Sequence, residues 1–95
     1  MAKYRKLPIV VEALQYEGQQ TPEMETFLDG ENHRYSVLHM DKETGITEIS
    51  LHIWYPEGSR FANAGDYIIK DVVGEYYPCN PHVFWATYEL VDPDD

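Results

Sequence analysis

The hydrophobic and polar positions of the chain predict strands at its start and in its middle. In residues 8–16 both alternate sets of positions carry apolar side chains, which is typical of a strand that is covered on both faces. Residues 34–40 and 46–55 predict two further strands around a turn at 41–45. From Ile49 onward, apolar and mostly polar positions alternate, so we expect this hairpin to bury one face.

Two shorter strands are predicted near the end of the chain. Residues 67–70 and 75–79 are rich in tyrosine and isoleucine and are separated by a turn at 72–74. Between the two pairs of strands, the run from Pro56 to Ser59 interrupts the apolar pattern. We expect the strand before this run to end there.

Two short helices are predicted by the residues that begin them. Thr21 followed by Pro22 is a typical helix start, because the Thr hydroxyl caps free backbone amides and Pro favours the first helical position. Gly30 supplies a stop for this helix. Asn80 followed by Pro81 repeats the starting signal near the end of the chain.

This order of elements predicts a single α+β domain over residues 1–95. The arrangement we expect is a mostly antiparallel sheet of about five strands packed with two short helices. Ninety-five residues are enough for one domain only. The acidic tail at residues 92–95 is expected to be frayed.

The charge and the apolar runs of the chain narrow its possible partners. Seven Lys and Arg against 17 Asp and Glu give a formal net charge of −10, which repels nucleic-acid backbones and disfavours generic nucleic-acid binding. Apolar runs such as residues 7–11 are far too short to span a bilayer. The basic start is not followed by a signal-peptide core, so we expect an intracellular protein without a membrane segment.

The length and the aromatic content favour self-association. A domain of this length buries only about 60–65% of its extended surface, so a second copy can cover apolar area that one copy leaves in water. Aromatic residues make up 14% of the chain, and exposed rings are common at interfaces. We therefore expect a homo-oligomer.

Two blocks of the sequence resemble a family of small bacteriophage and prophage proteins. Lys3 to Ala13 resembles the opening of that family. Its closing block is matched by residues 64–70, 74–79, Pro81, Phe84 and 87–89. The sequence departs from the family where Asn80 replaces a Lys and His82 replaces an Asp. What the resemblance implies is a phage-encoded accessory protein that works in the cytoplasm of a bacterial host, with no known reaction attached.

No set of side chains in the sequence carries a recognised catalytic or metal-binding signature. Cys79 precedes a predicted helix, where a thiolate is favoured, and His82 follows it, but no third group orients the pair. The four histidines match no metal-ligand spacing. Glu12, Asp66 and Glu75 could form an acid–base pair only if the fold brought two of them together. We therefore expect no catalytic residue, no metal and no cofactor.

The scarce cations and the aromatic rings indicate a ligand site instead. Cations that converge beside rings would suit a small phosphorylated ligand carrying a base, because Arg grips phosphate and rings stack on bases. The predicted ligand-binding residues are Arg5, Lys6, Arg60, Lys70, Tyr76 and Tyr77. Arg34 and Trp54 are a further cation and a further ring of the same kind. The alternative is that Arg5, Lys6 and Lys70 pair with carboxylates and only tie the sheet ends together.

The function that we expect is binding without catalysis. A phage-encoded accessory protein of this kind would sequester a small nucleotide-like signal of host defence, which is a counter-defence role. Three alternatives remain open: an acidic inhibitor on the basic surface of a host nucleic-acid-binding enzyme, a minor virion or assembly protein, and a small hydrolase that uses Cys79 or a carboxylate pair.

Overall fold

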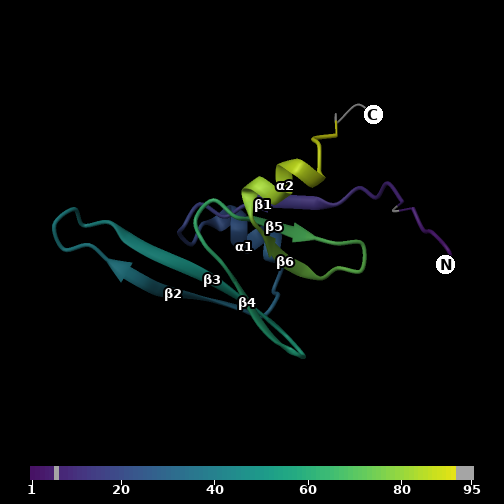
Figure 1. Cartoon of the computed structure of the whole chain (residues 1–95). Helices are drawn as coiled ribbons and strands as arrows, with labels where there is room; N and C mark the ends of the chain where they lie inside the picture. Colours follow the sequence, from purple (N-terminus) through teal and green to yellow (C-terminus); the bar gives the residue numbers. More distant parts are fainter. Residues whose placement is uncertain (6, 92–95) are drawn as a thin grey trace.

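The computed structural model, which describes residues 1–5 and 7–91, is a small α+β fold (Figure 1). The described residues form six strands and two helices. In chain order these are β1 (Glu12–Gln15), α1 (Pro22–Leu28), β2 (His33–Met40), β3 (Thr47–Tyr55), β4 (Gly58–Ala62), β5 (Tyr67–Lys70), β6 (Tyr76–Cys79) and α2 (Pro81–Thr87). The predicted fold class and both short helices are confirmed. The tail that we expected to be frayed lies outside the described residues.

The strands form two antiparallel sheets of three, so the predicted single sheet of about five strands is wrong. One sheet has the order β1-β5-β6 and the other the order β2-β3-β4. The strand that was missed is β4, which pairs with β3 so that Tyr55 lies opposite Gly58. Gly58 has a φ of 147°, which glycine adopts without strain, and this lets the chain reverse where the sequence predicts only an end. β4 itself reads Gly-Ser-Arg-Phe-Ala, which has no apolar alternation.

β1 is shorter than the strand predicted at residues 8–16. Its partner β5 ends at Lys70, opposite Glu12, because the chain then turns back into β6. Residues 7–11 therefore run on past the sheet without a partner strand in the part of the chain that the structure describes. Three side chains of this segment are largely exposed: Leu7 at 72%, Ile9 at 50% and Val10 at 72%.

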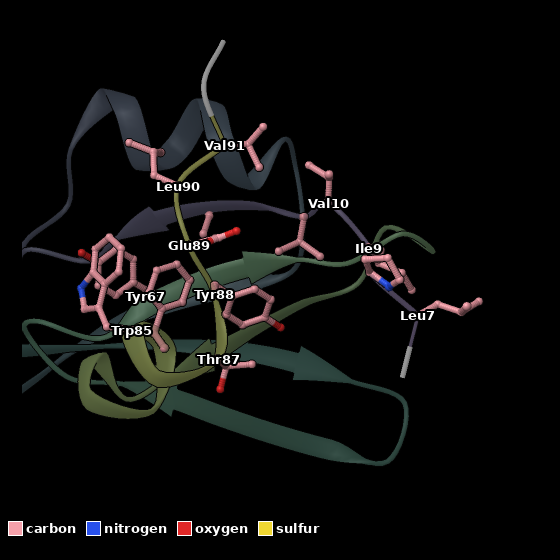
Figure 2. Close-up of a pocket in the computed structure, with 14 residues that line it drawn as sticks. Leu7, Ile9, Val10, Tyr67, Trp85, Thr87, Tyr88, Glu89, Leu90 and Val91 are labelled. Carbon is pink, nitrogen blue, oxygen red and sulfur yellow. The ribbon is translucent and has the colours of Figure 1, made fainter. Parts of the chain in front are cut away.

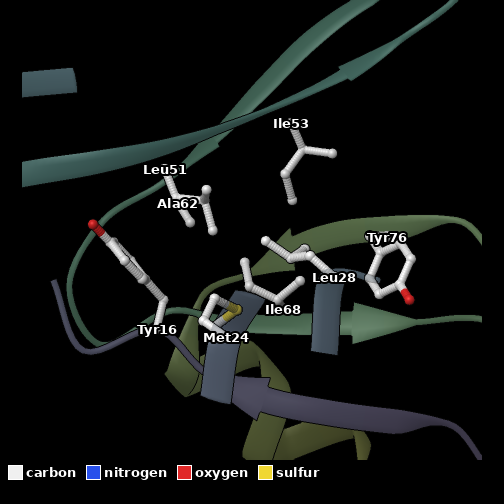
Figure 3. Packing of buried hydrophobic residues seen from close by; sticks show 8 residues of the cluster. All are labelled: Tyr16, Met24, Leu28, Leu51, Ile53, Ala62, Ile68 and Tyr76. Atoms are coloured by element: carbon white, nitrogen blue, oxygen red, sulfur yellow. The ribbon is translucent and has the colours of Figure 1, made fainter. Parts of the chain in front are cut away.

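The two sheets and α1 share one hydrophobic core (Figure 3). Leu51 of β3, Ile68 of β5 and Leu28 of α1 point toward one another there, and each is fully buried. Tyr16, directly after β1, is also buried, and its hydroxyl donates to the carbonyl oxygen of Ile49 at 2.7 Å. This hydrogen bond joins the end of the first sheet to β3 of the second.

Both helices begin where the sequence predicts. The hydroxyl of Thr21 accepts the amide of Met24 at 3.1 Å, and the side-chain oxygen of Asn80 accepts the amide of His82 at 2.8 Å. α2 covers the face of the first sheet that points away from the core, where the ring of Phe84 stacks on a ring of β5 with 4.0 Å between the ring centres. In residues 1–5 and 7–91, neither helix has the length and apolarity that crossing a bilayer requires.

The hairpin of β2 and β3 extends beyond the rest of the molecule (Figure 1). The radius of gyration is 15.6 Å, against about 12 Å for a compact domain of this length. The pairing register shifts between Val37 and His39, which leaves a bulge at Leu38. Four apolar side chains around the end of the hairpin are exposed: Val37 at 61%, Leu38 at 56%, Met40 at 60% and Ile46 at 63%. The core therefore covers only the near half of the hairpin.

Leu28→Ala is expected to lower the free energy of unfolding by about 2–5 kcal/mol, because it opens a cavity in the shared core. The matched change Leu38→Ala removes the same atoms from an exposed side chain and should cost less than about 0.5 kcal/mol. Urea denaturation followed by tryptophan fluorescence measures both. Equal losses for the two variants would contradict this position of the core.

Candidate functional site

The five predicted ligand-binding residues that the structure describes do not all lie together. Arg5 is exposed in the segment before β1 and makes no ion pair within the described residues, and Lys6 falls outside them. Tyr77 lies opposite Ile69 in the sheet, on the face that α2 covers. Burial, with a hydrogen bond to Tyr88, raises the pKa of Tyr77 to about 12, so its hydroxyl is neutral and already engaged at pH 7.

Arg60, Lys70 and Tyr76 do come together, around Tyr55. The guanidinium carbon of Arg60 lies 5.5 Å from the centre of the Tyr55 ring, and Lys70 Nζ lies 5.6 Å from the centre of the Tyr76 ring. The Tyr55 hydroxyl donates to the carbonyl oxygen of Tyr76, and Tyr76 is only 4% exposed. Both tyrosines therefore join β3 to β6, and the two cations lie over them. The Tyr76 ring is not free to stack on a base.

The surroundings of Arg60 are not positively charged. Burial raises the pKa of Tyr55, the charge of Arg60 lowers it, and the negative charges of Glu31, Glu75 and Glu57 raise it again. Arg60 thus shares its neighbourhood with three carboxylates. An anionic ligand would gain little electrostatic attraction in this place.

A second group of rings lies on the outer face of the β2-β3-β4 sheet. The guanidinium carbon of Arg34 lies 5.4 Å from the centre of the Trp54 ring. The ring of His52 stacks near Trp54 with 5.7 Å between centres, and the ring of Phe61 lies 5.8 Å from that of His52. His52 and Trp54 flank the buried Ile53 along β3, so their side chains point away from the core. We call these four residues the outer ring row.

The outer ring row is accessible and is fixed by the strand register. Phe61 is 57% exposed, Arg34 is exposed, and His52 and Trp54 are half-buried. Arg34 lies opposite His52, and His52 lies opposite Phe61, so the row crosses all three strands with a cation at one end. Flat rings can stack on planar ligands, and a guanidinium can hold an anion with two hydrogen bonds.

Part of this group could be identified from the sequence. Arg34 and Trp54 were recognised as a cation and a ring, although not as neighbours. His52 could have been added, because the alternation in residues 46–55 puts it on the face of Trp54. Phe61 could not, since its place depends on β4, for which the sequence gives no strand signal.

Ser50 and His52 form a pair that resembles part of a catalytic site but cannot act as one. Ser50 Oγ lies 3.0 Å from His52 Nε2, which is within hydrogen-bonding distance. Ser50 is fully buried, so no substrate carbon can reach its oxygen. No side chain in the described residues makes a hydrogen bond with the other nitrogen of His52. The pair serves to orient the imidazole ring within the outer ring row.

The other catalytic candidates are also accounted for by packing and turns. Burial raises the pKa of the Cys79 thiol, and the negative charge of Asp66 raises it further, which disfavours a thiolate at this helix start. Asp66 accepts the amide of Asn63 at 2.9 Å, so its carboxylate is engaged in a turn. Glu12 and Glu75 lie on opposite sides of β5 and form no acid–base pair.

A small polar cluster joins α1 to β2. His33 Nε2 lies 2.8 Å from a carboxylate oxygen of Glu25, and Gln20 donates to the same carboxylate at 3.0 Å. Burial alone would raise the pKa of Glu25, but the approach of Tyr35, His33 and Gln20 outweighs it and holds the pKa below its ordinary value. The Tyr35 hydroxyl is buried without a hydrogen bond of normal geometry, and burial with the nearby negative charge raises its pKa.

An apolar groove of about 680 Å³ runs between the segment before β1 and the end of the described chain (Figure 2). Its walls are residues 7–11 on one side and α2 with residues 88–91 on the other. Trp85 and Leu90 are exposed in it, at 56% and 87%. Glu89 is the one charged residue among the described residues that line it. Of the predicted ligand-binding residues that the structure describes, none lines this groove.

Glu25→Gln is expected to lower the free energy of unfolding at pH 7 by about 0.5–1 kcal/mol, a small effect because the carboxylate is 33% exposed and screened by water. Ionised Glu25 adds stability above the ordinary carboxyl pKa of about 4.3, and this contribution is lost as the pH falls through the lowered pKa of the folded state. The deficit of the variant should therefore shrink between pH 5 and about pH 3. Urea titrations across this range measure it, with Glu23→Gln of the same helix as the control. A deficit that does not change with pH would contradict this role of the carboxylate.

Comparison with known proteins adds no assignment to this geometry. In the described residues, no three or more His, Cys, Asp or Glu side chains are placed to hold one metal ion. No protein-family model, no curated protein and no solved structure matches the chain. The resemblance to the phage and prophage family therefore stays a prediction, and the function is argued from the side chains alone.

Proposed function

We propose that this chain is a phage-encoded protein that acts by binding in the cytoplasm of a bacterial host. In this proposal, the outer ring row holds a small phosphorylated ligand that carries a planar base. The phage setting is supported by the two sequence blocks at 3–13 and 64–89. The ligand class is supported by one observation above all, the run of Arg34, Trp54, His52 and Phe61 across an exposed sheet face.

The geometry of the outer ring row suits the two halves of such a ligand. A base lies flat on the rings of Trp54 and His52, and stacking of this kind contributes about 1–3 kcal/mol per base. The phosphate then lies toward Arg34, whose guanidinium donates two parallel hydrogen bonds. Neighbouring strands are about 4.8 Å apart, so a row that crosses three strands is about 10 Å long. A nucleotide is of similar length.

The net charge of −10 is compatible with a small anion although it disfavours long nucleic acids. A polyanion meets the charges of the whole surface, whereas a single phosphate responds to charges within about one Debye length, roughly 8 Å in physiological salt. Arg34 lies within this range, with its guanidinium carbon 5.4 Å from the centre of the Trp54 ring. Capture of a host nucleotide signal in this way would act as counter-defence.

Binding is preferred to catalysis because the candidate nucleophiles of both sheets are disfavoured. Ser50 is fully buried, and the Cys79 thiol has a raised pKa. Holding a ligand requires only shape, stacking and a paired charge, all of which the row offers.

A second candidate is an acidic inhibitor of a host nucleic-acid-binding enzyme. It is favoured because most carboxylates of the described chain form no ion pair: within residues 1–5 and 7–91 the one ion pair is His33–Glu25. Exposed carboxylates such as Glu43, Glu48 and Glu57 are therefore available to a basic surface. Salt-sensitive capture of such an enzyme by the Trp54→Ala variant would favour this candidate, because the rings play no part in it.

Isothermal titration calorimetry against mono-, di- and cyclic nucleotides tests the proposal. We expect at least one nucleotide to bind, Trp54→Ala to weaken it by about tenfold or more, and Arg34→Ala to weaken it and reduce its salt dependence. Arg60→Ala is the matched control, because it removes a cation from the opposite face of the same sheet. No heat with any nucleotide, or an equal loss in Arg60→Ala, would refute this site.

A further inference from the structure

We propose that two copies of this chain pair as antiparallel strands through residues 7–11, about a two-fold axis at Ile9. This inference is independent of the ligand proposed above, because the outer ring row belongs to the other sheet. It begins from a conflict between sequence and fold. The sequence of residues 8–16 is that of a strand covered on both faces, yet the structure leaves residues 7–11 unpaired beyond β5.

The surface around this segment is apolar and open. Leu7 and Val10 are each 72% exposed, and the groove of Figure 2 lies directly beside them. All six strands in the described chain are already placed, and none of them reaches residues 7–11. No strand of the described chain is left to pair with this segment, and the proposal takes the partner strand from a second copy.

The backbone of the segment is suited to a partner on its outer edge. The amide of Tyr16 donates to Asp66 and its carbonyl accepts from Gly65, so Tyr16 faces the β5 side of the sheet. Backbone groups alternate in direction along an antiparallel strand. Leu14 and Glu12 thus face β5. If residues 7–11 continue the strand when they pair, the same alternation directs the amides of Val11, Ile9 and Leu7 outward.

The position of Pro8 agrees with this direction. Proline has no amide hydrogen, so within sheets it lies where no hydrogen bond is needed. By the same alternation, the nitrogen of Pro8 faces the β5 side, where β5 has already ended at Lys70. The outer edge therefore keeps an unbroken series of donors.

Two-fold pairing at Ile9 gives apolar cross-strand contacts. Residues whose numbers add to 18 lie opposite each other, so Ile9 meets Ile9 of the second copy, and Leu7 meets Val11. In the paired strand, Leu7, Ile9 and Val11 would share a face with Ala13, and all of these residues line the groove. Such pairs on one face are the unit that stabilises a sheet. A second copy is thus the partner that this segment fits.

Charge complementarity supports the same partner and the same register. Glu89 is the one charged residue among the described residues that line the groove, and it makes no ion pair there. In the proposed register, Arg5 of one copy lies opposite Ala13 of the other, a residue that lines the groove with Glu89. Arg5 is exposed and also makes no ion pair within the described chain. Pairing therefore brings each Arg5 to the edge of the groove that Glu89 of the other copy lines, twice per dimer.

Sedimentation equilibrium of the full chain, from about 1 to 300 μM, tests the proposal, because so small an interface is expected to dissociate in the micromolar range. The wild type should move from 11.1 kDa toward twice that mass. Ile9→Pro removes an outward amide and should remain monomeric throughout. Val10→Pro is the matched control, since it removes an amide that faces the β5 side, and it should dimerise within about threefold of the wild type. Circular dichroism confirms that both variants fold.

A charge exchange tests the register separately. Arg5→Glu and Glu89→Arg should each weaken dimerisation by about tenfold, and the double variant should recover most of that loss. Glu57→Arg, in the turn between β3 and β4, controls for the change in net charge and should not weaken dimerisation. A wild type that stays monomeric, equal dimerisation of the two proline variants, or no recovery in the double variant would overturn the proposal.

Discussion

One small core holds two sheets and a helix together, and the rest of the structure depends on this sharing. Leu51, Ile68 and Leu28 come from three different elements and are each fully buried in the same cluster. A chain of 95 residues cannot build a separate core for each sheet. Each sheet therefore offers one face to the shared cluster, and its other face must be covered by something else or remain in water.

The outer face of one sheet is covered and that of the other is exposed. This difference decides which side chains are packed inside the structure and which are accessible to a ligand. α2 covers the outer face of the first sheet through stacked rings, and Tyr77 lies beneath it. The outer face of the second sheet has no helix over it, so its rings stay accessible beside Arg34. The cations near the core, Arg60 and Lys70, are instead held over tyrosines that connect the sheets. The outer ring row and the proposed pairing segment belong to different sheets. A dimer would therefore leave the outer ring row of each copy accessible.

The sequence predicts those features that depend on interactions between residues close together in the chain. It does not predict the features that depend on contacts between distant residues. Thr21 and Asn80 cap their helices as expected, and Asp66 accepts a turn amide, because each acts on residues two or three positions away. The division into two sheets depends on which strands pack on the shared core, and no local pattern encodes that choice. The strand predicted from residue 8 begins only at Glu12, because the length of β1 is set by where its partner β5 ends. The rings of the outer row likewise come together only through the pairing of β3 with β4.

Native-state hydrogen exchange measures directly whether the two sheets share one core. β3 and β5 are the central strands of their sheets, so the amides of Leu51 and Ile53 report on one sheet and those of Ile68 and Ile69 on the other. If the core is shared, all four amides should open with the same free energy, and that free energy should fall equally with added denaturant. Exchange from one sheet at a distinctly lower free energy, while the other stays protected, would show that the sheets are held separately and would contradict this account.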